Sequence, residues 1–331
     1  METNVAARPD ELIWSITNSS VTSRALQVAA ELGVADQVGE AGTPVAEVAS
    51  RCAVDTGALE RLLNLLSAVG IFTVDDGVLA HTEASLLLRD DDPGSLRPFA
   101  RMMGLPSMWQ ALGALDHAVR TGRPGMELVD PGGFFGLLAN APADAAVFHA
   151  AMQARGQAFA AAVVHTYDFT PFKRIVDVAG GQGHLLRALL DAISHAEGVL
   201  FELPPVAALT PSAGRLTTVA GDFFTDPLPS GDAYLLMEIL HDWPDDRCID
   251  ILTAIRRASQ HGAVLLVIEA VLDEGAPDPR THNLDVIMLV MTGGRERTVA
   301  EFRRLLGRAG FQLTSITPTG GPMRIVEAVA V

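Results

Sequence analysis

The chain lacks several features that mark secreted, metal-bound or nucleic-acid-binding proteins. It has only 2 cysteines, Cys52 and Cys248, and their wide separation predicts neither a disulfide framework nor a thiolate metal site. It has a single lysine, and its 24 basic residues are outnumbered by 40 acidic ones, for a net charge of -16. Because phosphate neutralisation needs clustered basic side chains, we expect no nucleic-acid partner and no anionic membrane surface.

The sequence also has no apolar run long enough to cross a bilayer. The run AVLLVI at 263–268 has only the length of a strand. The first residues, METNVAARPDE, show no basic stretch followed by an apolar core, so we expect no secretory signal and a soluble, cytoplasmic protein. Hydrophobic residues make up 49% of the 331 residues, which is enough for packed cores in about two domains.

The first hundred residues predict helices followed by a hairpin. Residues 25–32 have helical apolar spacing that stops at Gly33. Thr43 before Pro44 predicts the N-cap and first position of a second helix, and Asp55 predicts the N-cap of a third.

Two β-rich runs, IFTV and VLAHT, flank an Asp-Asp-Gly turn at 75–77. Asp-Gly supplies the positive φ angles of a tight hairpin turn. Helices followed by a hairpin form the winged-helix arrangement, and many such modules bind DNA. The helix after Asp55 offers only Arg61 as a base, beside Glu60, which makes a DNA-binding regulator a weak alternative.

The rest of the chain divides into a helical segment and a strand-helix alternation. Residues 101–170 are rich in Met, Phe and Gly, which suits both a core and a pocket for a flat apolar ligand. Residues 171–331 alternate strands with helices, a pattern that predicts a mainly parallel sheet covered by helices. The predicted domains are therefore 1–100, 101–170 and 171–331.

The first strand of the alternation leads into a glycine-rich loop, VDVAGGQG at 176–183. A dinucleotide fingerprint starting at Gly181 would need Gly or Ala where Leu186 stands, which argues against a nicotinamide oxidoreductase. Asp177 would also place a negative charge near a pyrophosphate. It suits a cationic ligand instead, and S-adenosylmethionine has an ammonium, a sulfonium and no phosphate.

Acidic residues end the next two strands. Glu202 follows Gly183 by 19 residues, a place from which a carboxylate can accept both ribose hydroxyls. Asp222 can accept from an adenine amino group while Phe223 packs on the ring. Each feature alone is common, but the ordered set predicts a nucleoside site.

The fourth strand runs into the segment MEILHDWPDD at 237–246, which places His241 just past the carboxyl end of a parallel strand. A neutral imidazole there can remove a hydroxyl proton. Glu269 and Glu296 reach the same edge, where carboxylates can fix the tautomer of His241 and stabilise its imidazolium. The plainer alternative is that His241 caps the helix starting at Asp245 and that Glu269 pairs with an arginine.

The ordered series VDVAGGQG, FELP, GDFF, ILHDWPDD, IEAVL, NLDVIML and GGRERT resembles the small-molecule O-methyltransferases of the caffeate and hydroxyindole type, including bacterial tailoring enzymes for aromatic natural products. The resemblance extends over nearly the whole chain. It implies an α/β class I methyltransferase fold, Rossmann-like, with a mostly parallel seven-stranded sheet and an N-terminal helical, winged-helix-like dimerisation domain. It also implies S-adenosylmethionine as cofactor, a homodimer, a small aromatic acceptor and no metal.

The resemblance assigns roles to the residues that match the family's motifs. The general base falls on His241 and its flanking carboxylates on Glu269 and Glu296. Cofactor contacts are expected from Arg155, Asp177, Gly180, Gly181, Gly183, Glu202, Asp222, Phe223 and Met237. Acceptor contacts are expected from Met103, Phe148, Met152, Asp242 and Met288.

Two departures from the family pattern matter. Ala179 replaces the usual first glycine of the loop, where a methyl group is expected to fit. Met102 and Met103 stand where plant phenolic enzymes often have a polar residue, which disfavours a small phenylpropanoid acceptor. The resemblance implies methylation of a phenolic hydroxyl. A relative of the same fold could instead use the bound cofactor without methyl transfer, in hydroxylation, decarboxylation or a pericyclic step.

Overall fold

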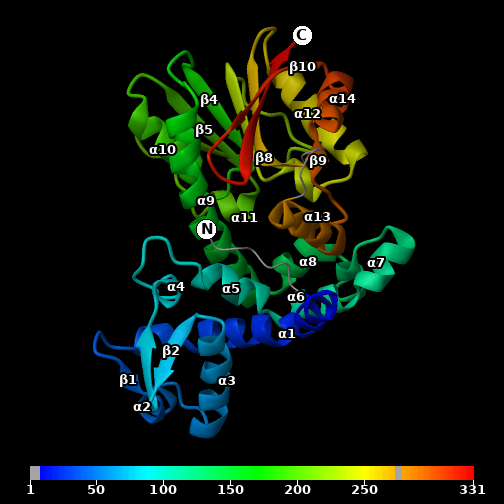
Figure 1. Cartoon of the computed structure of the whole chain (residues 1–331). Helices are drawn as coiled ribbons and strands as arrows, with labels where there is room; N and C mark the ends of the chain where they lie inside the picture. The colour runs from blue at the N-terminus through cyan, green and yellow to red at the C-terminus, as the bar shows by residue number, and fades with distance from the viewer. Residues whose placement is uncertain (1–7, 273–277) are drawn as a thin grey trace. The chain divides into compact units, whose positions relative to one another are not determined.

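The computed structural model describes residues 8–272 and 278–331, which form two compact units (Figure 1). The first unit consists of the chain up to Trp109 together with Pro142–Ala154. The second consists of Gln110–Ala141 and Arg155–Val331. The three-part division at 100 and 170 stays a prediction, and most of the N-terminal stretch that we read for a signal lies outside the described residues.

The first unit begins with a helix longer than its apolar spacing indicated. Helix α1 starts at Pro9, a favourable first helical position, and ends at Leu32 because Gly33 takes the left-handed conformation with φ of 66°. Asp55 caps α3 by accepting a hydrogen bond from the Ala58 N–H at 2.8 Å, as predicted. The helices of this unit include α1 (Pro9–Leu32), η1 (Val34–Gln37), α2 (Val45–Arg51), α3 (Thr56–Ala68), α4 (Glu83–Leu86) and α5 (Arg97–Met103).

A small sheet in the order β1-β3-β2 completes the winged-helix pattern of this unit. The hairpin of β2 (Phe72–Asp75) and β3 (Val78–His81) turns through Asp76 and Gly77, whose φ angles of 49° and 75° confirm the predicted tight turn. The predicted cap at Thr43 was wrong. Residues Thr43–Pro44 form strand β1, and the Thr43 hydroxyl accepts from the Gly39 N–H at 3.0 Å instead of capping α2.

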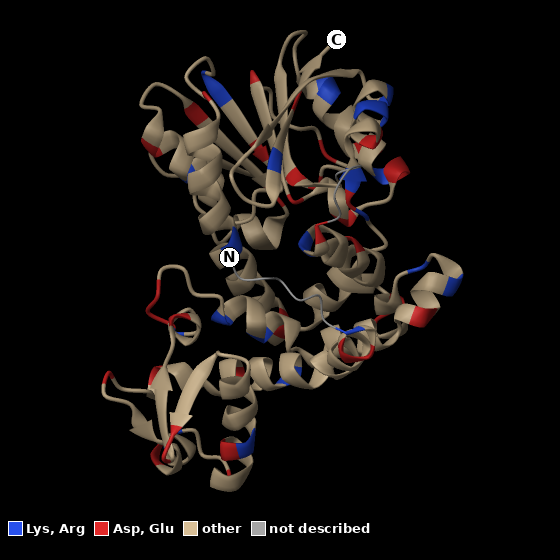
Figure 2. Cartoon of the chain, viewed as in Figure 1, with Lys and Arg blue, Asp and Glu red and all other residues tan. Residues whose placement is uncertain are grey.

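Helix α3 packs three leucines, Leu59, Leu63 and Leu66, into the core of the first unit. Its charged residues Glu60 and Arg61 lie side by side in the sequence, and Figure 2 shows acidic and basic positions interspersed in this unit. An unbroken basic face of the kind that binds DNA is therefore absent from the described part of α3.

Two helices, α6 (Pro106–Gly113) and α9 (Pro142–Thr166), pass from one unit into the other along the chain. The second unit contains a large sheet and further helices. These helices are α7 (Leu115–Thr121), η2 (Gly125–Leu128), α8 (Gly133–Asn140), α10 (His184–Ala192), α11 (Pro204–Ala207), η3 (Leu240–Asp242), α12 (Asp245–Ala258), α13 (Pro279–Met291) and α14 (Val299–Arg308).

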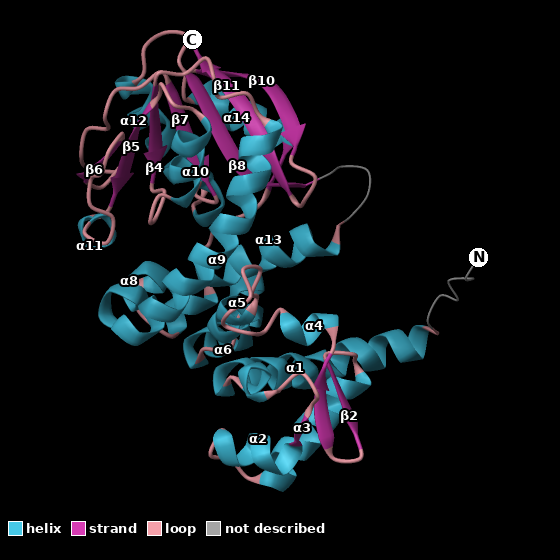
Figure 3. Ribbon diagram, turned by 90° about the vertical axis from the view of Figure 1, so that its left-hand side faces the viewer, coloured by secondary structure: helices cyan, strands magenta, loops and turns pink. Residues whose placement is uncertain are grey.

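The large sheet has the strand order β10-β11-β8-β7-β4-β5-β6 (Figure 3). Every neighbouring pair from β8 to β6 is parallel, whereas β11 lies antiparallel to both of its neighbours. A short strand, β9 (Arg297–Thr298), pairs in parallel with the end of β8. The other strands are β4 (Arg174–Val178), β5 (Glu197–Glu202), β6 (Leu216–Ala220), β7 (Ala233–Met237), β8 (Val264–Leu272), β10 (Phe311–Pro318) and β11 (Met323–Ala330).

Apolar side chains on both faces of the central strands explain why the sheet is buried. In β8, Leu265 and Val267 belong to one core, which includes buried residues of α12 and α14. The alternate residues Leu266 and Ile268 belong to a second core, with buried residues of α9 and α10. Successive side chains of a strand point to opposite faces, so a strand covered on both faces reads as one continuous apolar run.

The sheet contains a topological switch point. From β4 the chain moves to β5 on one side, and it later returns to place β7 on the other side of β4. Ligands of open α/β sheets bind outside the carboxyl ends of the strands at such a point. The glycine loop follows β4, and the segment with His241 follows β7, so both predicted sites lie at this edge.

Candidate active site

The glycine loop after β4 wraps closely around a buried carboxylate. A Cβ atom added to Gly180 would lie 2.3 Å from the carboxyl carbon of Asp177, so no larger residue fits there without a shift. Gly181 has φ of +58°, and its N–H donates to Glu202 Oε2 at 3.0 Å. Gly183 has φ of +71° and is the N-cap residue of α10. These three glycines are needed for the turn and the close approach.

Asp177 is buried within β4 with 1% of its surface exposed, and neither carboxylate oxygen has a hydrogen-bond partner among the described residues. Burial, together with the nearby charge of Glu202, raises the pKa of Asp177 to about 7. An unpaired buried carboxylate is costly unless a cation or donor reaches it. This site therefore fits the ammonium group of S-adenosylmethionine.

Glu202 ends β5 and lies beside the same loop. Its Oε1 accepts from the Leu203 N–H at 2.7 Å, and its Oε2 accepts from Gly181. Burial raises the pKa of this carboxyl, against the effect of the two N–H donors. Each carboxylate oxygen has two acceptor sites, so the fixed side chain can still accept from ribose hydroxyls.

Asp222 and Phe223 follow β6 at the same edge of the sheet. Asp222 is held by its own loop, since its Oδ1 accepts from the Phe224 N–H at 2.8 Å. Phe223 packs edge-on against Phe224 and Trp243, at ring-centroid distances of 4.6 and 6.3 Å. The pair offers an acceptor and a half-buried aromatic ring, which suit the amino group and face of an adenine.

His241 lies in η3, just beyond β7, with 6% of its surface exposed. Its Nδ1 is 2.8 Å from Glu296 Oε1, and its Nε2 is 3.9 Å from Asp242 Oδ1. Burial acts to lower the pKa of His241, but the hydrogen bond to Glu296 and the charges of Asp242 and Glu269 prevail and raise it to about 10. Burial also raises the pKa of Asp242 to about 6, although His241 opposes this shift.

Glu269 supports the backbone near His241 rather than its ring. The Oε1 of Glu269 accepts from the N–H groups of Ile239 and His241 at 3.2 and 3.1 Å. Its side chain is fully buried, and burial raises its pKa to about 7 against the opposing charge of His241. The structure thus brings both predicted carboxylates to His241, one to its side chain and one to its backbone.

The contacts of His241 and Glu269 differ from the plainer alternative, in which His241 caps α12 and Glu269 pairs with an arginine. Pro244, not His241, is the N-cap residue of α12. The Oε1 of Glu269 accepts from two backbone N–H groups, and its Oε2 has no hydrogen-bond partner in the part of the chain that the structure covers. Instead, His241 and Glu269 contact each other, because the backbone N–H of His241 donates to Glu269 Oε1.

Sequence reasoning missed Glu238, which lies between β7 and His241. The Arg155 guanidinium donates to its carboxylate, with Nη2 2.6 Å from Oε1 and Nε 2.9 and 3.0 Å from the two oxygens. Glu238 has a positive φ of 55°, which a non-glycine residue rarely adopts. Arg155, predicted to contact the cofactor, thus has a carboxylate partner within the protein itself.

The predicted acceptor residues fall in both units and are half-buried. Met288 lies in α13 and Asp242 in η3, both in the second unit. Met103, Phe148 and Met152 belong to the first unit. Their contact with an acceptor stays a prediction, as does the role of Met237 at the end of β7.

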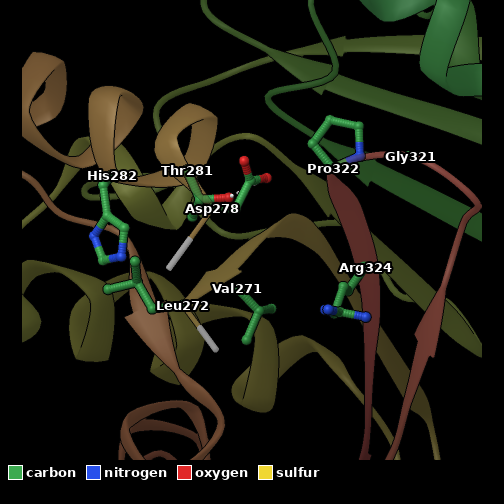
Figure 4. A pocket seen from close by; sticks show the side chains of 8 residues that line it. All are labelled: Val271, Leu272, Asp278, Thr281, His282, Gly321, Pro322 and Arg324. Carbon is green, nitrogen blue, oxygen red and sulfur yellow. Dashed lines mark hydrogen bonds between the residues drawn. The ribbon is translucent and has the colours of Figure 1, made fainter. Parts of the chain in front are cut away.

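A separate small cavity lies where β8, α13 and β11 meet (Figure 4). Its volume of about 60 Å³ holds a few water molecules and is far too small for a nucleoside. Asp278 and Arg324 line it, but no residue predicted for the cofactor or the acceptor does. This cavity is therefore not a candidate for the ligand site.

None of the helices formed by the described residues is both long and apolar enough for a membrane span. No group of three or more His, Cys, Asp or Glu side chains among these residues is arranged to hold a metal ion.

Comparison with known proteins identifies the family. Residues 112–312 match the O-methyltransferase domain, and residues 14–90 match the O-methyltransferase dimerisation domain. The chain is 39% identical over 325 residues to the phenazine O-methyltransferase PhzM of Lysobacter antibioticus, covering 96% of this chain and 95% of that protein.

Two solved structures are also similar. The human N-acetylserotonin methyltransferase in complex with S-adenosylmethionine has a TM-score of 0.91 and 28% identity, over 99% of both chains. The O-methyltransferase NcsB1 of neocarzinostatin biosynthesis, in complex with S-adenosylmethionine and 2-hydroxy-5-methyl naphthoic acid, has a TM-score of 0.80 and 35% identity, over 94% of this chain and 96% of that one.

The fold and these similarities define an S-adenosylmethionine-dependent methyltransferase. Within that class, the chain belongs to the O-methyltransferase family that has an N-terminal dimerisation domain. It is an S-adenosylmethionine-dependent O-methyltransferase, with the mostly parallel sheet and the helical N-terminal region that its sequence predicted.

Proposed function

We propose that the enzyme methylates a phenolic hydroxyl of an aromatic secondary metabolite, with His241 as the general base. The observation that carries this proposal is the 2.8 Å contact between His241 Nδ1 and Glu296 at the carboxyl edge of the sheet. Relatives act on aromatic compounds, as the names phenazine O-methyltransferase and the bound naphthoic acid indicate.

Glu296 determines which ring nitrogen can act as the base. A carboxylate accepts only, so the Nδ1 of His241 carries a proton toward Glu296, and Nε2 is left to take a proton from the acceptor hydroxyl. Asp242, 3.9 Å from Nε2, stabilises the imidazolium that results. Glu269 holds the backbone of His241 in place during the transfer.

The cofactor, when bound, supplies a methyl group on a sulfonium that is open to attack by the deprotonated hydroxyl. Its binding is assigned to the residues at the ends of β4 to β7. Asp177 receives the ammonium group, Glu202 the ribose hydroxyls, and Asp222 with Phe223 the adenine. The remaining proposed contacts are Arg155, Gly180, Gly181, Gly183 and the backbone carbonyl of Met237.

The acceptor is proposed to meet an apolar surface with few polar groups. The proposed acceptor contacts are Met103, Phe148, Met152, Asp242 and Met288. Methionine adapts to irregular apolar shapes, which suits a polycyclic ring system better than a small polar phenol.

A homodimer is part of the same proposal. Helix α1 exposes large apolar side chains, among them Ile13 and Trp14, which are 69% and 70% exposed. A groove of about 590 Å³ lies between α1 and α3 and is lined by Val28, Leu62 and Trp109. Exposed apolar surface of this kind marks protein interfaces, and residues 14–90 match a dimerisation domain. Light scattering coupled to size exclusion should give twice the mass of 35.0 kDa.

The activity is tested by incubation with isotopically labelled S-adenosylmethionine and a panel of polycyclic and simple phenols, read by mass spectrometry. We expect a labelled O-methyl product from polycyclic phenols. His241→Ala should lose at least about a hundredfold in kcat and keep its affinity for the cofactor. Consumption of a phenol without transfer of the label would overturn the proposed reaction, and unchanged turnover in the variant would remove His241 as the base.

A further inference from the structure

The segment Gly294–Arg297 lies directly against the segment that carries His241. The Arg295 N–H donates to the carbonyl oxygen of His241 at 2.8 Å, and Glu296 binds its ring. A Cβ atom on Gly294 would lie 1.9 Å from that same carbonyl oxygen, so the close approach requires glycine. Three successive residues thus engage the backbone or side chain of His241, but Arg297 has no role in the function proposed above.

Arg297 makes the most extensive set of contacts in this segment. Its Nη1 donates to the carbonyl of Leu240 at 2.9 Å, and its Nη2 donates to the carbonyl of Trp243 at 2.8 Å. Leu240 and Trp243 flank His241 and Asp242 in the chain. One guanidinium therefore binds both ends of the four-residue segment 240–243.

The remaining donors of Arg297 bind the start of α12. Its Nε and Nη2 donate to Asp245 Oδ1 at 3.0 and 2.8 Å, and Nη2 is also 3.3 Å from Cys248 Sγ. The side chain is 1% exposed, whereas that of Asp245 is 52% exposed. A charge buried this deeply is tolerated because nearly every N–H of the fork has an acceptor.

The planar fork matters for this arrangement. A lysine has one ammonium nitrogen on a flexible stem and cannot reach both Leu240 and Trp243 in a fixed geometry. Segment 240–243 would then be held less tightly through the carbonyls of Leu240 and Trp243, and His241 could shift relative to Glu296. A displacement of about 1 Å at a reacting group can cost about a hundredfold in rate.

We propose that Arg297 is a positioning residue for methyl transfer, which fixes segment 240–243 so that the His241 ring stays on Glu296. The proposal rests on the proposed role of His241 as the base. It explains why the arginine is buried beside the site although it has no direct contact with the His241 ring in the described structure.

Arg215 provides a matched control. It is also an arginine that binds backbone carbonyls, those of Leu190, Ile193 and Ala196. It directly precedes β6 and therefore lies at the amino ends of the strands, opposite the site. Arg215→Lys removes the same kind of fork without touching segment 240–243.

The experiment measures kcat, KM for the acceptor, the Kd of S-adenosylhomocysteine, and the pH profile of kcat/KM for Arg297→Lys and Arg215→Lys. We expect Arg297→Lys to lose between about ten- and a hundredfold in kcat, with the Kd within about twofold of the parent. The acidic limb of the kcat/KM pH profile of Arg297→Lys should move to lower pH, because a loosened His241 ring loses part of its contact with Glu296. Arg215→Lys should lower only thermal stability.

Two comparisons keep the outcomes separate. If Arg297→Lys fails to fold, Asp245→Asn replaces it, since this exposed change removes only the charged partner of Arg297 and should shift the acidic limb in the same direction. An unchanged limb and an unchanged kcat in the folded variant would overturn the positioning role. Full activity of His241→Ala in the same assay would instead overturn the proposed base, independently of Arg297.

Discussion

Arg155 and Glu238 form a bidentate ion pair at the carboxyl end of β7, with 2.6 Å between Arg155 Nη2 and Glu238 Oε1. The resemblance to the family implies that Arg155, one of the predicted cofactor contacts, binds the carboxylate of the cofactor. In the structure its Nε and Nη2 are directed to Glu238, and Nη1 has no protein acceptor among the described residues. Glu238 thus competes for the cation that the cofactor would use, and its own charge would repel the carboxylate of the cofactor.

We therefore predict that Glu238→Gln tightens the binding of S-adenosylhomocysteine several-fold. The amide keeps the shape and one acceptor oxygen but removes the competing charge. Isothermal titration calorimetry measures the Kd directly.

A ligand without a carboxylate provides the control for this prediction. 5′-Methylthioadenosine keeps the adenine and the ribose, so its Kd should be the same in the parent and in Glu238→Gln. Equal changes for both ligands would show that Glu238 acts on the general shape of the site and not through Arg155.

The pH dependence of catalysis should follow the pKa of His241. This pKa is raised to about 10, so the free enzyme carries a protonated imidazole at neutral pH. The base must be neutral, and kcat/KM should therefore rise as the pH approaches that value. In Glu296→Gln the imidazolium of His241 loses its hydrogen-bonded anion, so the pKa of His241 should fall toward its ordinary value. The acidic limb of the kcat/KM pH profile should therefore move to lower pH.

Glu269→Gln is the matched comparison for Glu296→Gln. Glu269 contacts the backbone N–H of His241 at 3.1 Å, and a glutamine oxygen can still accept that bond. We expect a smaller shift of the acidic limb, caused only by the lost charge. A larger shift in Glu269→Gln than in Glu296→Gln would contradict the different roles that the two contacts indicate.

Much of this site could be predicted because it follows from strand ends. Asp177, Glu202 and His241 each lie in or just beyond a strand of β-rich sequence, and parallel strands bring their carboxyl ends to one edge. The hairpin turn at Asp76-Gly77 and the cap at Asp55 depend on neighbouring residues alone, so they too could be read locally.

Other features depend on tertiary contacts that a sequence does not display. Thr43 is a residue type that often caps helices, but here it lies in strand β1, which pairs with β3. Its hydroxyl accepts a hydrogen bond from the Gly39 N–H and does not cap α2. Arg297 appears in the sequence as one charged residue in a polar motif, and only the fold buries it under segment 240–243. The positive φ of Glu238 could not be inferred from its type, since glutamate rarely adopts that conformation.

Asp177 should couple stability to pH in the free protein. Its pKa is about 7 in the folded chain against an ordinary 3.8, so the folded state holds this proton over a range where the unfolded chain has lost it. Its contribution to stability is thus fully present below pH 3.8 and is lost as the pH rises through 7. We expect the Tm of Asp177→Asn to fall less than that of the parent between pH 5 and about 8.

The same variant should bind the cofactor less well. Loss of the charged partner of an ammonium group predicts a Kd roughly ten- to a hundredfold weaker for S-adenosylhomocysteine. 5′-Methylthioadenosine, which lacks the ammonium group, should lose much less. An equal loss for the two ligands would place the ammonium group elsewhere.

Ala179 is predicted to be a strained residue of the glycine loop. Its φ is 58°, a left-handed conformation that costs a residue with a Cβ about 1–2 kcal/mol. Ala179→Gly removes this strain but adds freedom to the unfolded chain, worth about 0.4–1 kcal/mol. We therefore expect the free energy of unfolding to stay constant or to rise by up to about 1.6 kcal/mol, measured by chemical denaturation. Ala188→Gly, inside α10, is the control and should lose about 1 kcal/mol. A loss of the same size in both variants would mean that the backbone at Ala179 is not strained.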